Sequence, residues 1–458
     1  MIQRIHAPFT ISALFLIFIT SLVPLRMATA IQPDKVFVIN EGAFGQANAS
    51  VTVFYPSTGE RVSDVFSAGN DRLLGDVAND AQWINGKLYI VVNNSHKIEV
   101  VDPQSYKSKQ TIFIDSDTHG GSPRKILQVA PDKAYVTNLF GNNISVIDLA
   151  SGAETGTIDV GPGPEGIVRS GGFAFVALSG LGQGNEVAVI DIERDELVTR
   201  LEVGDNPVHL AVAPDGNVWS VATGNYGFDD NFQYDPDLET FGQIVIINSA
   251  TLEISGRFET GGHPGKLVFV DEDHALLQHD GLRLIDVDNL SLIEEPFLDR
   301  TIYSFDVTEH IHVSEPSVYI TVVPDFASSG RVIRYGYDGE AVDSFQAGIG
   351  PGAIAFWYQE ATGLEHDILI ADRIRLNQNY PNPFNPKTFI SYELPVGGHV
   401  RLDVYDTLGR LVATLVDGRV PAGDHAVTFN AAGFVSGLYL YRLSFEDYSI
   451  SRQMLLIK

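Results

Sequence analysis

The ionisable residues with the most regular placement lie beside a Gly-x-x-Pro-x-x-apolar pattern that occurs five times. Its proline falls at positions 123, 164, 207, 264 and 351. The ionisable residues within or next to these segments are His119, Arg124, Lys125, Glu165, His209, His263 and Lys266. A few polar groups that converge on a concave surface can orient a bound ligand, and three histidines together could bind a metal ion. The alternative is that each group only solvates its own turn, since the spacing does not show convergence.

A long loop, Thr223–Gly242, combines aromatic and acidic side chains. The aromatic residues are Tyr226, Phe228, Phe232 and Tyr234, and the acidic ones include Asp229, Asp230, Asp235 and Asp237. Aromatic faces beside carboxylates suit a large, partly apolar ligand that carries amides or cations. The four aspartates are also candidate calcium ligands, although the D-x-D-x-D-G order of a calcium loop is absent. A solvated lid that packs only on its own unit is the remaining interpretation.

The sequence lacks the common catalytic motifs. It contains no G-x-S-x-G elbow, no H-E-x-x-H zinc motif, no P-loop and no dinucleotide-binding glycine fingerprint. His310 and His312 could supply two metal ligands from one face of a strand, but no third ligand accompanies them. We therefore assign no catalytic residue and expect no required cofactor, with calcium left open. A binding protein is favoured over an enzyme.

Acidic residues outnumber basic residues by 58 to 30, and the formal net charge is −28. Such a charge repels phosphate backbones and anionic membrane surfaces, so nucleic acid is not an expected partner. The chain has no cysteine. Disulfides, thiolate metal sites, cysteine nucleophiles and lipid attachment through an N-terminal cysteine are therefore excluded.

Residues 1–30 have the pattern of a signal peptide. Arg4 provides a positive charge, Ile11–Leu25 an apolar stretch, and Ala28–Ala30 a small-residue cleavage site. The apolar stretch is shorter than the roughly 20 residues that span a bilayer. Cleavage after Ala30 is expected to leave a chain without a transmembrane span, exported through the periplasm.

The elements that would position these groups recur along the chain. The five prolines are 41, 43, 57 and 87 residues apart, and 87 is close to two ordinary steps. Alternating β-branched and aromatic runs between turn residues indicate strands. Units of four strands that repeat about every 40–45 residues are typical of a β-propeller. The third strands of the units number seven: SVTVFY, KIEVVD, ISVIDL, EVAVID, QIVIIN, LRLIDV and RVIRYG.

We therefore predict an all-β fold with a seven-bladed β-propeller over residues 31–358. The strand Lys35–Asn40 starts the first unit without an inner strand, and Ala353–Gln359 has no later partner, so these two strands are expected to pair and close the ring. The connections between second and third strands are expected on the same face as the Gly-x-x-Pro corners. That face would carry all the long loops, and long loops in compact domains commonly serve a function.

The stretch DKAYVTNLFGNNISVIDLASG is similar to the repeat of the YVTN family of secreted propellers, and the similarity covers about residues 35–358. The stretches VFVINEGAFGQANASVTVFYPSTGE and LGDVANDAQWINGKLYIVVNNSHKIEVVD further resemble a subfamily of surface propellers. Some members of that subfamily lie beside outer-membrane transporters and capture cobalamin. The resemblance therefore implies a corrinoid as a candidate ligand and an outer-membrane transporter as a candidate partner.

A linker, residues 359–376, leads to a second domain at residues 377–458. Val400, Leu402 and Val404 alternate with polar residues, as in a half-buried strand, and we predict a small β-sandwich. This segment resembles the C-terminal sorting domain of the type IX secretion system. The matching segments are QNYPNPFNP, VYDTLGRLVATLVDG, PAGDHAVTFNAAG, SGLYLYRL and the final MLLIK. The resemblance implies recognition by the secretion machinery and a protein that is secreted or held at the outer cell surface.

Three functions are compatible with these features. The first is a surface protein that binds a corrinoid or another nutrient at its loop-rich face and passes it to a transporter. The second is a scaffold or adhesion protein that binds a protein or a glycan. The third is a metal-dependent propeller lactonase or lyase.

Overall fold

The computed structural model describes residues 32–114, 121–228, 233–308, 317–358, 375–394, 398–407, 409–420, 423–445 and 448–458. The expectations for the signal peptide at residues 1–30 and for most of the linker lie outside these residues. So do the candidates His119, Asp229, Asp230, Phe232, His310 and His312.

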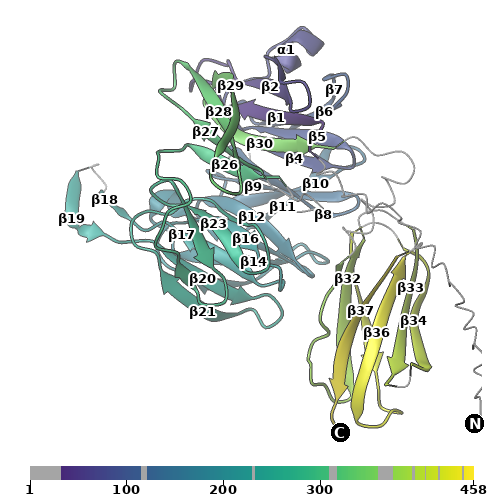
Figure 1. The fold of residues 1–458 in the computed structure, drawn as a ribbon. Helices are drawn as coiled ribbons and strands as arrows, with labels where there is room; N and C mark the ends of the chain where they lie inside the picture. The colour runs from purple at the N-terminus through teal and green to yellow at the C-terminus, as the bar shows by residue number, and fades with distance from the viewer. Residues whose placement is uncertain are drawn as a thin grey trace, which may run out of the picture.

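Within the described residues up to Tyr358, seven four-stranded antiparallel sheets are present (Figure 1). Sheet 1 consists of β30 (Pro351–Trp357), β1 (Lys35–Asn40), β2 (Ser50–Tyr55) and β3 (Glu60–Val62). Sheet 2 consists of β4 (Ala78–Ile84), β5 (Lys87–Val92), β6 (Lys97–Val101) and β7 (Ser108–Phe113). Sheet 3 consists of β8 (Pro123–Ala130), β9 (Lys133–Asn138), β10 (Asn143–Asp148) and β11 (Ala153–Asp159).

The remaining four sheets repeat this strand order. Sheet 4 consists of β12 (Pro164–Ser170), β13 (Phe173–Leu178), β14 (Glu186–Asp191) and β15 (Glu196–Glu202). Sheet 5 consists of β16 (Pro207–Val212), β17 (Val218–Ala222), β20 (Gln243–Asn248) and β21 (Glu253–Glu259). Sheet 6 consists of β22 (Leu267–Phe269), β23 (His274–Gln278), β24 (Leu282–Asp286) and β25 (Ser291–Leu292). Sheet 7 consists of β26 (Ser304–Val307), β27 (Ser317–Val322), β28 (Ser329–Gly336) and β29 (Ala341–Ile349).

The middle strands are apolar runs because a neighbouring sheet covers each of their faces. In β5 and β13, every residue after the first is buried. A strand with one solvated face would alternate polar and apolar residues. The outermost strand β15 does alternate, between half-buried and exposed residues.

Apolar clusters join the sheets in a closed cycle. In β1, Phe37 and Ile39 pack with sheet 2, whereas Val36 and Val38 pack with sheet 7. This division follows the two-residue period of a strand. Similar clusters join sheets 2 and 3, 3 and 4, 4 and 5, 5 and 6, and 6 and 7. The sheets therefore share their cores pairwise around a common axis.

The last strand of this region closes the cycle. β30 pairs antiparallel with β1, with Val38 opposite Ile354 and Lys35 opposite Trp357. The expected pairing of the first strand with the late strand is therefore confirmed. The two ends of the region are held together in one sheet.

The long connections contain short elements of their own. They include the helix α1 (Val65–Asn70) and the single-turn helices η1 (Asn93–Ser95) and η2 (Gly180–Gly182). None of the helices in the described part of the chain is long and apolar enough to cross a membrane.

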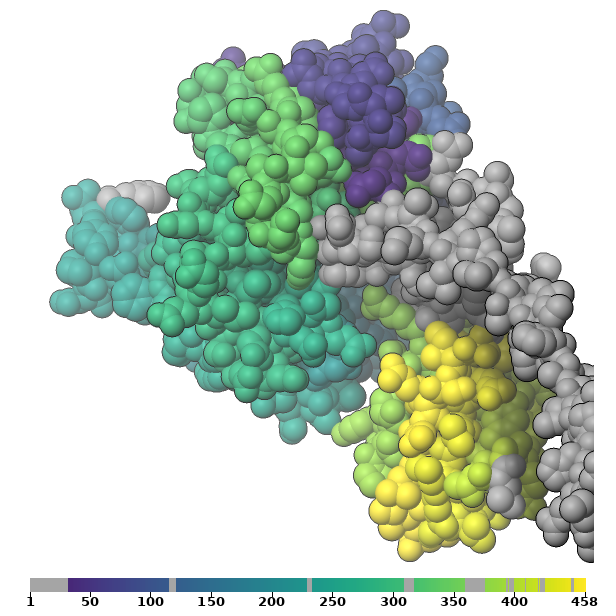
Figure 2. All heavy atoms as spheres, in the orientation of Figure 1, coloured from purple at the N-terminus to yellow at the C-terminus, as the bar shows by residue number. Residues whose placement is uncertain are grey.

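The segment between β17 and β20, expected as a long loop, is partly a hairpin. Its strands β18 (Tyr226–Phe228) and β19 (Tyr234–Glu239) pair with each other and with no other sheet. Pro236 lies within β19 and cannot donate to a strand ladder, which argued against a strand in the sequence. The hairpin projects from the body of the sheets (Figures 1 and 2).

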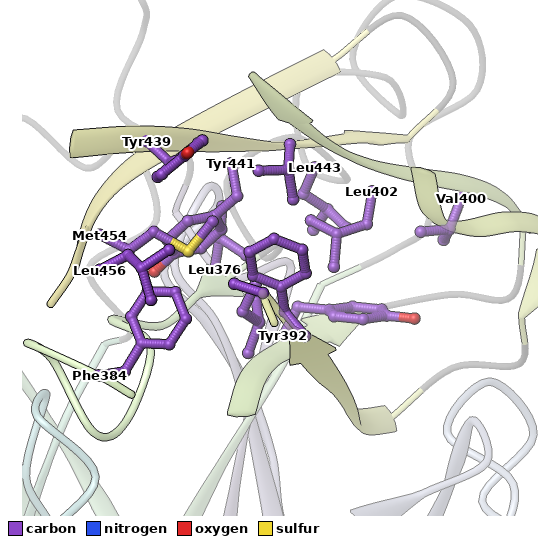
Figure 3. Close-up of a cluster of buried hydrophobic side chains, with 14 of the residues drawn as sticks. Leu376, Phe384, Tyr392, Val400, Leu402, Tyr439, Tyr441, Leu443, Met454 and Leu456 are labelled. Atoms are coloured by element: carbon purple, nitrogen blue, oxygen red, sulfur yellow. The ribbon is translucent and has the colours of Figure 1, made fainter. Parts of the chain in front are cut away.

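The described residues of the C-terminal region form two further sheets. One consists of β31 (Arg375–Leu376), β32 (Lys387–Leu394) and β35 (Gly423–Asn430). The other consists of β34 (Leu411–Val420), β33 (Gly398–Asp406), β36 (Gly437–Phe445) and β37 (Tyr448–Leu456). Both contribute to one apolar cluster, which includes Val400, Leu402 and Val404 as expected (Figure 3 labels the first two).

Candidate functional site

The first strands of the sheets lie next to one another around the axis. β30, β4, β8, β12, β16 and β22 make contact in that order, and β26 contacts β30. Pro123, Pro164 and Pro207 of the Gly-x-x-Pro corners are the first residues of β8, β12 and β16. The polar residues that follow these prolines are therefore brought to the innermost strands.

Two ion pairs link the inner strands of sheets 2, 3 and 4. Lys125 Nζ lies 3.1 Å from Asp80 Oδ1, and Arg124 Nε donates to Glu165 Oε2 at 2.9 Å. Asp80 is 4% exposed and also accepts a hydrogen bond from the backbone N–H of Ile126 at 3.1 Å. Since a buried carboxylate needs such partners, Asp80 holds β8 against β4.

Similar links join sheets 5, 6 and 7. His209 Nε2 donates to the carbonyl oxygen of Leu267 at 2.8 Å, and Lys266 Nζ lies 2.7 Å from Asp306 Oδ2. Burial lowers the pKa of His209 to about 3, and the positive charge of Lys266 acts in the same direction. The imidazole is therefore neutral near pH 7, in the form that donates to the carbonyl.

Sheet 7 is linked to sheet 1 by a carboxylate and a phenol. The Tyr303 hydroxyl lies 3.0 Å from each carboxylate oxygen of Glu41. Burial raises the pKa of Glu41, while the hydrogen bond from Tyr303 and the positive charges of Arg124 and Lys125 oppose that rise. The Tyr303 ring meets Phe326 edge-on, with 5.5 Å between the ring centroids.

These inner residues converge, which the sequence spacing did not reveal. Lys125 of sheet 3 acts electrostatically on His209 of sheet 5 and on Glu41 of sheet 1. Each of the three cations already has a carboxylate partner. The group is thus a nearly balanced polar network between sheets, in which a bound anion would have to compete with the internal carboxylates.

His263 connects the hairpin to the corner before sheet 6. Its ring stacks on Tyr226, with 4.1 Å between centroids and an interplanar angle of 23°. Its Nδ1 lies 3.1 Å from the carbonyl oxygen of Thr223, and its Nε2 lies 3.4 Å from Glu239 Oε1. His263 therefore holds the base of the hairpin rather than joining the axial network.

The acidic candidates for a calcium site are not gathered as ligands in the described residues. Asp235 accepts a hydrogen bond from the backbone N–H of Asp237 at 3.0 Å, which is a local turn. Across the described part of the chain, no group of three or more His, Asp or Glu side chains could hold a metal ion. The described residues therefore give no support to a calcium site at the hairpin.

Hydrogen bonds place the corners beside the connections between second and third strands. The backbone N–H of Gly163 donates to Asn142 Oδ1 at 3.1 Å, and that of Thr223 donates to the carbonyl of Asn206 at 3.0 Å. His279 Nε2 donates to the carbonyl of Gly261 at 2.8 Å. We call this side of the sheets the loop face, and the opposite side, with the other turns, the turn face.

Exposed apolar side chains occur on the loop face, and apart from Tyr226, Phe228 and Tyr234 they were not among the candidates from the sequence. Phe44 is 77% exposed and Phe140 is 64% exposed, each near the tip of its connection. The exposed apolar residues on the connections between second and third strands are Phe44, Phe140, Leu181, Tyr226, Phe228, Tyr234, Leu238, Phe241 and Phe326. Among the described residues, the turns of the turn face carry no exposed large apolar side chain. In the sequence, an exposed loop tip of this kind is marked only by a single Phe or Leu beside Gly or Ala in a polar loop.

A hollow of about 650 Å³ lies on the turn face, between sheets 3 and 4. Lys133 and Asp195 lie at its wall and pair with each other at 2.6 Å, and Lys133 also donates to the carbonyl of Ile192. Arg169 at the same wall donates to the carbonyl of Val129 at 2.8 Å. The cationic side chains at the wall of this hollow, Lys133 and Arg169, therefore already have partners within the protein.

Comparison with known families gives two matches. Residues 34–235 match a family described as a domain of unknown function, DUF5074. Residues 378–458 match the secretion system C-terminal sorting domain. No curated protein matches the chain in sequence.

Comparison with solved structures shows similarity of fold alone. A quinonprotein alcohol dehydrogenase-like protein from Bacteroides thetaiotaomicron is 15% identical, with a TM-score of 0.51 over 71% of this chain and 78% of that one. The WD40 domain of Pan2 from Neurospora crassa is 12% identical, with a TM-score of 0.43 over 89% of this chain and 98% of that one. Streptogramin B lyase is 12% identical, with a TM-score of 0.41 over 59% of this chain and 82% of that one. The fold of the region before the linker is propeller-like.

The sorting domain defines the destination of the protein. A type IX sorting domain at residues 378–458 indicates export, followed by secretion or attachment at the outer cell surface. It also indicates recognition by the type IX secretion machinery. The protein is therefore an exported, propeller-like protein with a C-terminal sorting domain.

Proposed function

We propose that the chain is an exported seven-bladed β-propeller that binds a ligand on its loop face, and that residues 377–458 form a β-sandwich that serves for sorting. The similarity to the YVTN repeat family supports this assignment of the propeller. In this proposal the seven sheets are the blades, residues 1–30 are a removed signal peptide, and residues 359–376 are the linker.

The segregation of exposed apolar side chains carries the proposal. Exposed apolar groups that gather on one side of a protein mark a binding surface. Here they lie on connections that hydrogen bonds fix to the neighbouring corners, so the surface is preformed and its ordering cost on binding is small. Phe326 extends this surface to Tyr303 and Glu41 near the axis, where a ligand would find polar partners.

A nutrient is the first candidate ligand, with a corrinoid as the specific hypothesis and an outer-membrane transporter as the recipient. This hypothesis is supported by the resemblance of the first three sheets to surface propellers that capture cobalamin. The inner histidine His209 is held in a hydrogen bond to a carbonyl. We therefore propose contact through the apolar tips rather than through histidine.

A second candidate is adhesion or scaffolding, which the hairpin favours. Tyr226, Phe228 and Tyr234 are each about half exposed on an element that projects from the body. A two-stranded hairpin is marginally stable alone, and a macromolecular partner could cover its sides. A protein or a glycan would then be the ligand.

A thermal-shift screen of the mature full chain tests the proposal. The compounds are cyanocobalamin, calcium chloride and soluble polysaccharides. A ligand that binds only the folded form raises the melting temperature according to its concentration relative to Kd. The double variant Phe140→Ser and Phe326→Ser should lose at least 10-fold in affinity for the stabilising compound.

The matched control is Val342→Ser. Val342 is 55% exposed, but it lies on the outermost strand of sheet 7, away from the loop face. The affinity of the Val342→Ser variant for the stabilising compound should equal that of the wild type. Equal affinity of the double variant and the wild type would exclude the loop tips as the binding surface.

A further inference from the structure

A single carboxylate connects the aromatic side chains of the hairpin. Glu239 Oε2 accepts a hydrogen bond from the Tyr234 hydroxyl at 2.9 Å, and Glu239 Oε1 lies 3.4 Å from His263 Nε2. The ring of His263 stacks on Tyr226, which lies opposite Glu239 in the strand register. Residues from β18, from β19 and from the corner before sheet 6 therefore meet at Glu239.

Two further rings extend this group. Phe228 lies opposite Tyr234 in the hairpin and meets its ring edge-on, with 5.9 Å between the centroids. At the base of the hairpin, the ring centroid of Phe241 lies 6.2 Å from that of His263. We call Tyr226, Phe228, Tyr234, Glu239, Phe241 and His263 the hairpin cluster. It belongs to the element that projects from the body of the sheets (Figure 2).

The rings of the hairpin cluster are exposed and yet held in place. Tyr226, Phe228, Tyr234 and Phe241 are each between 49% and 58% exposed. Stacking on the histidine fixes Tyr226, and the hydrogen bond to the carboxylate fixes Tyr234. A Cβ atom added at Gly227 would lie 3.0 Å from Tyr234 Cε2, so the Tyr234 ring packs directly against this backbone. Rings that are already held lose little conformational freedom when a ligand binds.

The charge around the hairpin cluster is negative. The segment Thr223–Gly242 contains five acidic residues and no lysine or arginine. Asp205 adds a carboxylate at the base, where it accepts a hydrogen bond from the Thr240 hydroxyl at 2.8 Å. This charge repels an anionic partner such as a sulfated or uronic-acid glycan. An uncharged hydroxyl group, in contrast, can donate a charge-assisted hydrogen bond to a carboxylate oxygen.

A neutral sugar ring matches both parts of this surface. When all the hydroxyl groups of a sugar point outward around the ring, its two faces carry only C–H groups, which are attracted to the negative face of an aromatic ring. The hydroxyl groups at the rim of the sugar can then donate to a carboxylate such as Glu239. Successive sugars of a β-linked chain repeat these faces, so a linear glycan can contact several rings of the cluster at once.

We propose that the hairpin cluster binds a neutral, β-linked glycan of glucose-type sugars, which stack on the exposed rings and donate hydroxyl hydrogen bonds to Glu239. The inference rests on the proposed binding role of the loop face and names the ligand class for its hairpin. A protein that docks by apolar burial alone fits less well, because it would cover the Glu239 carboxylate without offering it a donor.

Affinity electrophoresis of the mature full chain in gels that contain hydroxyethylcellulose, a neutral β-linked glucan, tests the proposal. Gels with carboxymethylcellulose present the same backbone with added carboxylates, and the chain should bind that polymer more weakly. The double variant Phe228→Leu and Tyr234→Leu keeps apolar bulk but removes two ring faces. Its affinity for hydroxyethylcellulose should fall by about 10-fold or more, whereas Tyr234→Phe keeps the ring and should lose less.

The matched control is Leu238→Ser, since Leu238 is 42% exposed on β19 and carries no ring. Its affinity for hydroxyethylcellulose should equal that of the wild type. Hydrogen exchange within 234–239 identifies a double variant that has lost the hairpin, and Phe228→Leu alone then decides the result.

Three results would overturn the inference. The first is wild-type affinity of a leucine variant that retains the hairpin, and the second is an equal loss in Leu238→Ser. The third is binding of oligolysine but not of hydroxyethylcellulose, which would favour a basic protein segment. If the wild type does not bind hydroxyethylcellulose but binds another compound through Phe140 and Phe326, this inference fails and the proposed function of the loop face stands.

Discussion

At the scale of single residues, the inner network combines groups that come from different repeats. Arg124 and Lys125 follow one corner, yet their partners Glu165 and Asp80 belong to the sheets on either side. Such pairs cost desolvation when buried and are strongly destabilising when one partner is removed. Their role in the fold is to set the positions of neighbouring inner strands.

The neutral imidazole of His209 makes stability depend on pH. Its pKa is about 3 in the folded chain against about 6.5 for histidine in an unfolded chain, so the unfolded chain binds a proton first as the pH falls. The stabilisation is complete above about pH 6.5 and is lost progressively down to pH 3. Between pH 7 and pH 5 the loss should be about 2 kcal/mol, since the slope approaches about 1.4 kcal/mol per pH unit below pH 6.5.

The comparison with His209→Gln isolates this contribution. Glutamine retains an N–H donor for the carbonyl of Leu267 but does not titrate. Chemical denaturation at pH 7 and pH 5 should show a larger loss for the wild type than for the variant. Equal losses would show that His209 is not held neutral in the fold.

Loss of the Asp80 partner should destabilise the ring. The variant Lys125→Met leaves Asp80 buried with one backbone donor, and we expect a loss of about 1–3 kcal/mol in the free energy of unfolding. The control Arg194→Gln breaks an exposed pair with Asp191 and should cost less than about 0.5 kcal/mol. A similar small cost for both variants would contradict the inter-sheet role.

Residue types at the corners could be predicted from the sequence, but their partners could not. Glu41, Tyr303 and Asp306 lie outside the Gly-x-x-Pro pattern, and only the ring closure brings Glu41 beside Tyr303. The corner histidines also serve different ends, since His209 donates to an inner carbonyl and His263 stacks on the hairpin. A shared sequence position did not give a shared role.

At the scale of elements, the hairpin of β18 and β19 is attached at its base through His263 and Tyr226. The variant His263→Ala removes the stacked ring and both of its polar contacts. Backbone amides within 226–239 should then exchange hydrogen faster, whereas the amides of β17 and β20 should keep their protection. The variant His263→Phe keeps the stacking, so its exchange rates should lie between those of the wild type and those of His263→Ala. Unchanged exchange in His263→Ala would contradict this attachment.

The strands were easier to predict than the hairpin for a physical reason. Middle strands are covered on both faces and read as apolar runs, such as Phe173–Leu178. The hairpin contributes to no apolar cluster, and the first five residues of β19 are all exposed, so no buried face gives it a pattern in the sequence. Loop tips such as Phe44 were missed because a single exposed aromatic residue has no period.

At the scale of the whole molecule, closure by β30 and β1 makes the ring one cooperative unit. A chain that ends at Ile349 lacks β30 and leaves the clusters of sheets 1, 2 and 7 incomplete. We expect its melting temperature to fall by roughly 10 °C or more, because several kcal/mol of apolar burial are lost. A chain that ends at Tyr358 keeps β30 and should melt close to the full-length protein. Equal melting temperatures of the two truncated chains would contradict the closure of the ring by β30 and β1.

The C-terminal sorting domain is a separate feature of the whole chain. Its sequence signal spans most of residues 378–458 and agrees with the family match. The ligand surface has no such signal, because it is assembled from tips that lie far apart in the sequence. The function of the propeller-like region therefore has to be read from the surface of the folded ring.

Hydrogen exchange across the mature full chain tests the ligand surface most directly. The measurement compares the free protein with the protein saturated by whichever screened compound raises its melting temperature most. Protection is predicted at the connections 41–49, 139–142, 223–242 and 323–328, with unchanged exchange at the turns 131–132 and 171–172. Protection confined to those turns, or no change in the four connections, would contradict binding at the loop face.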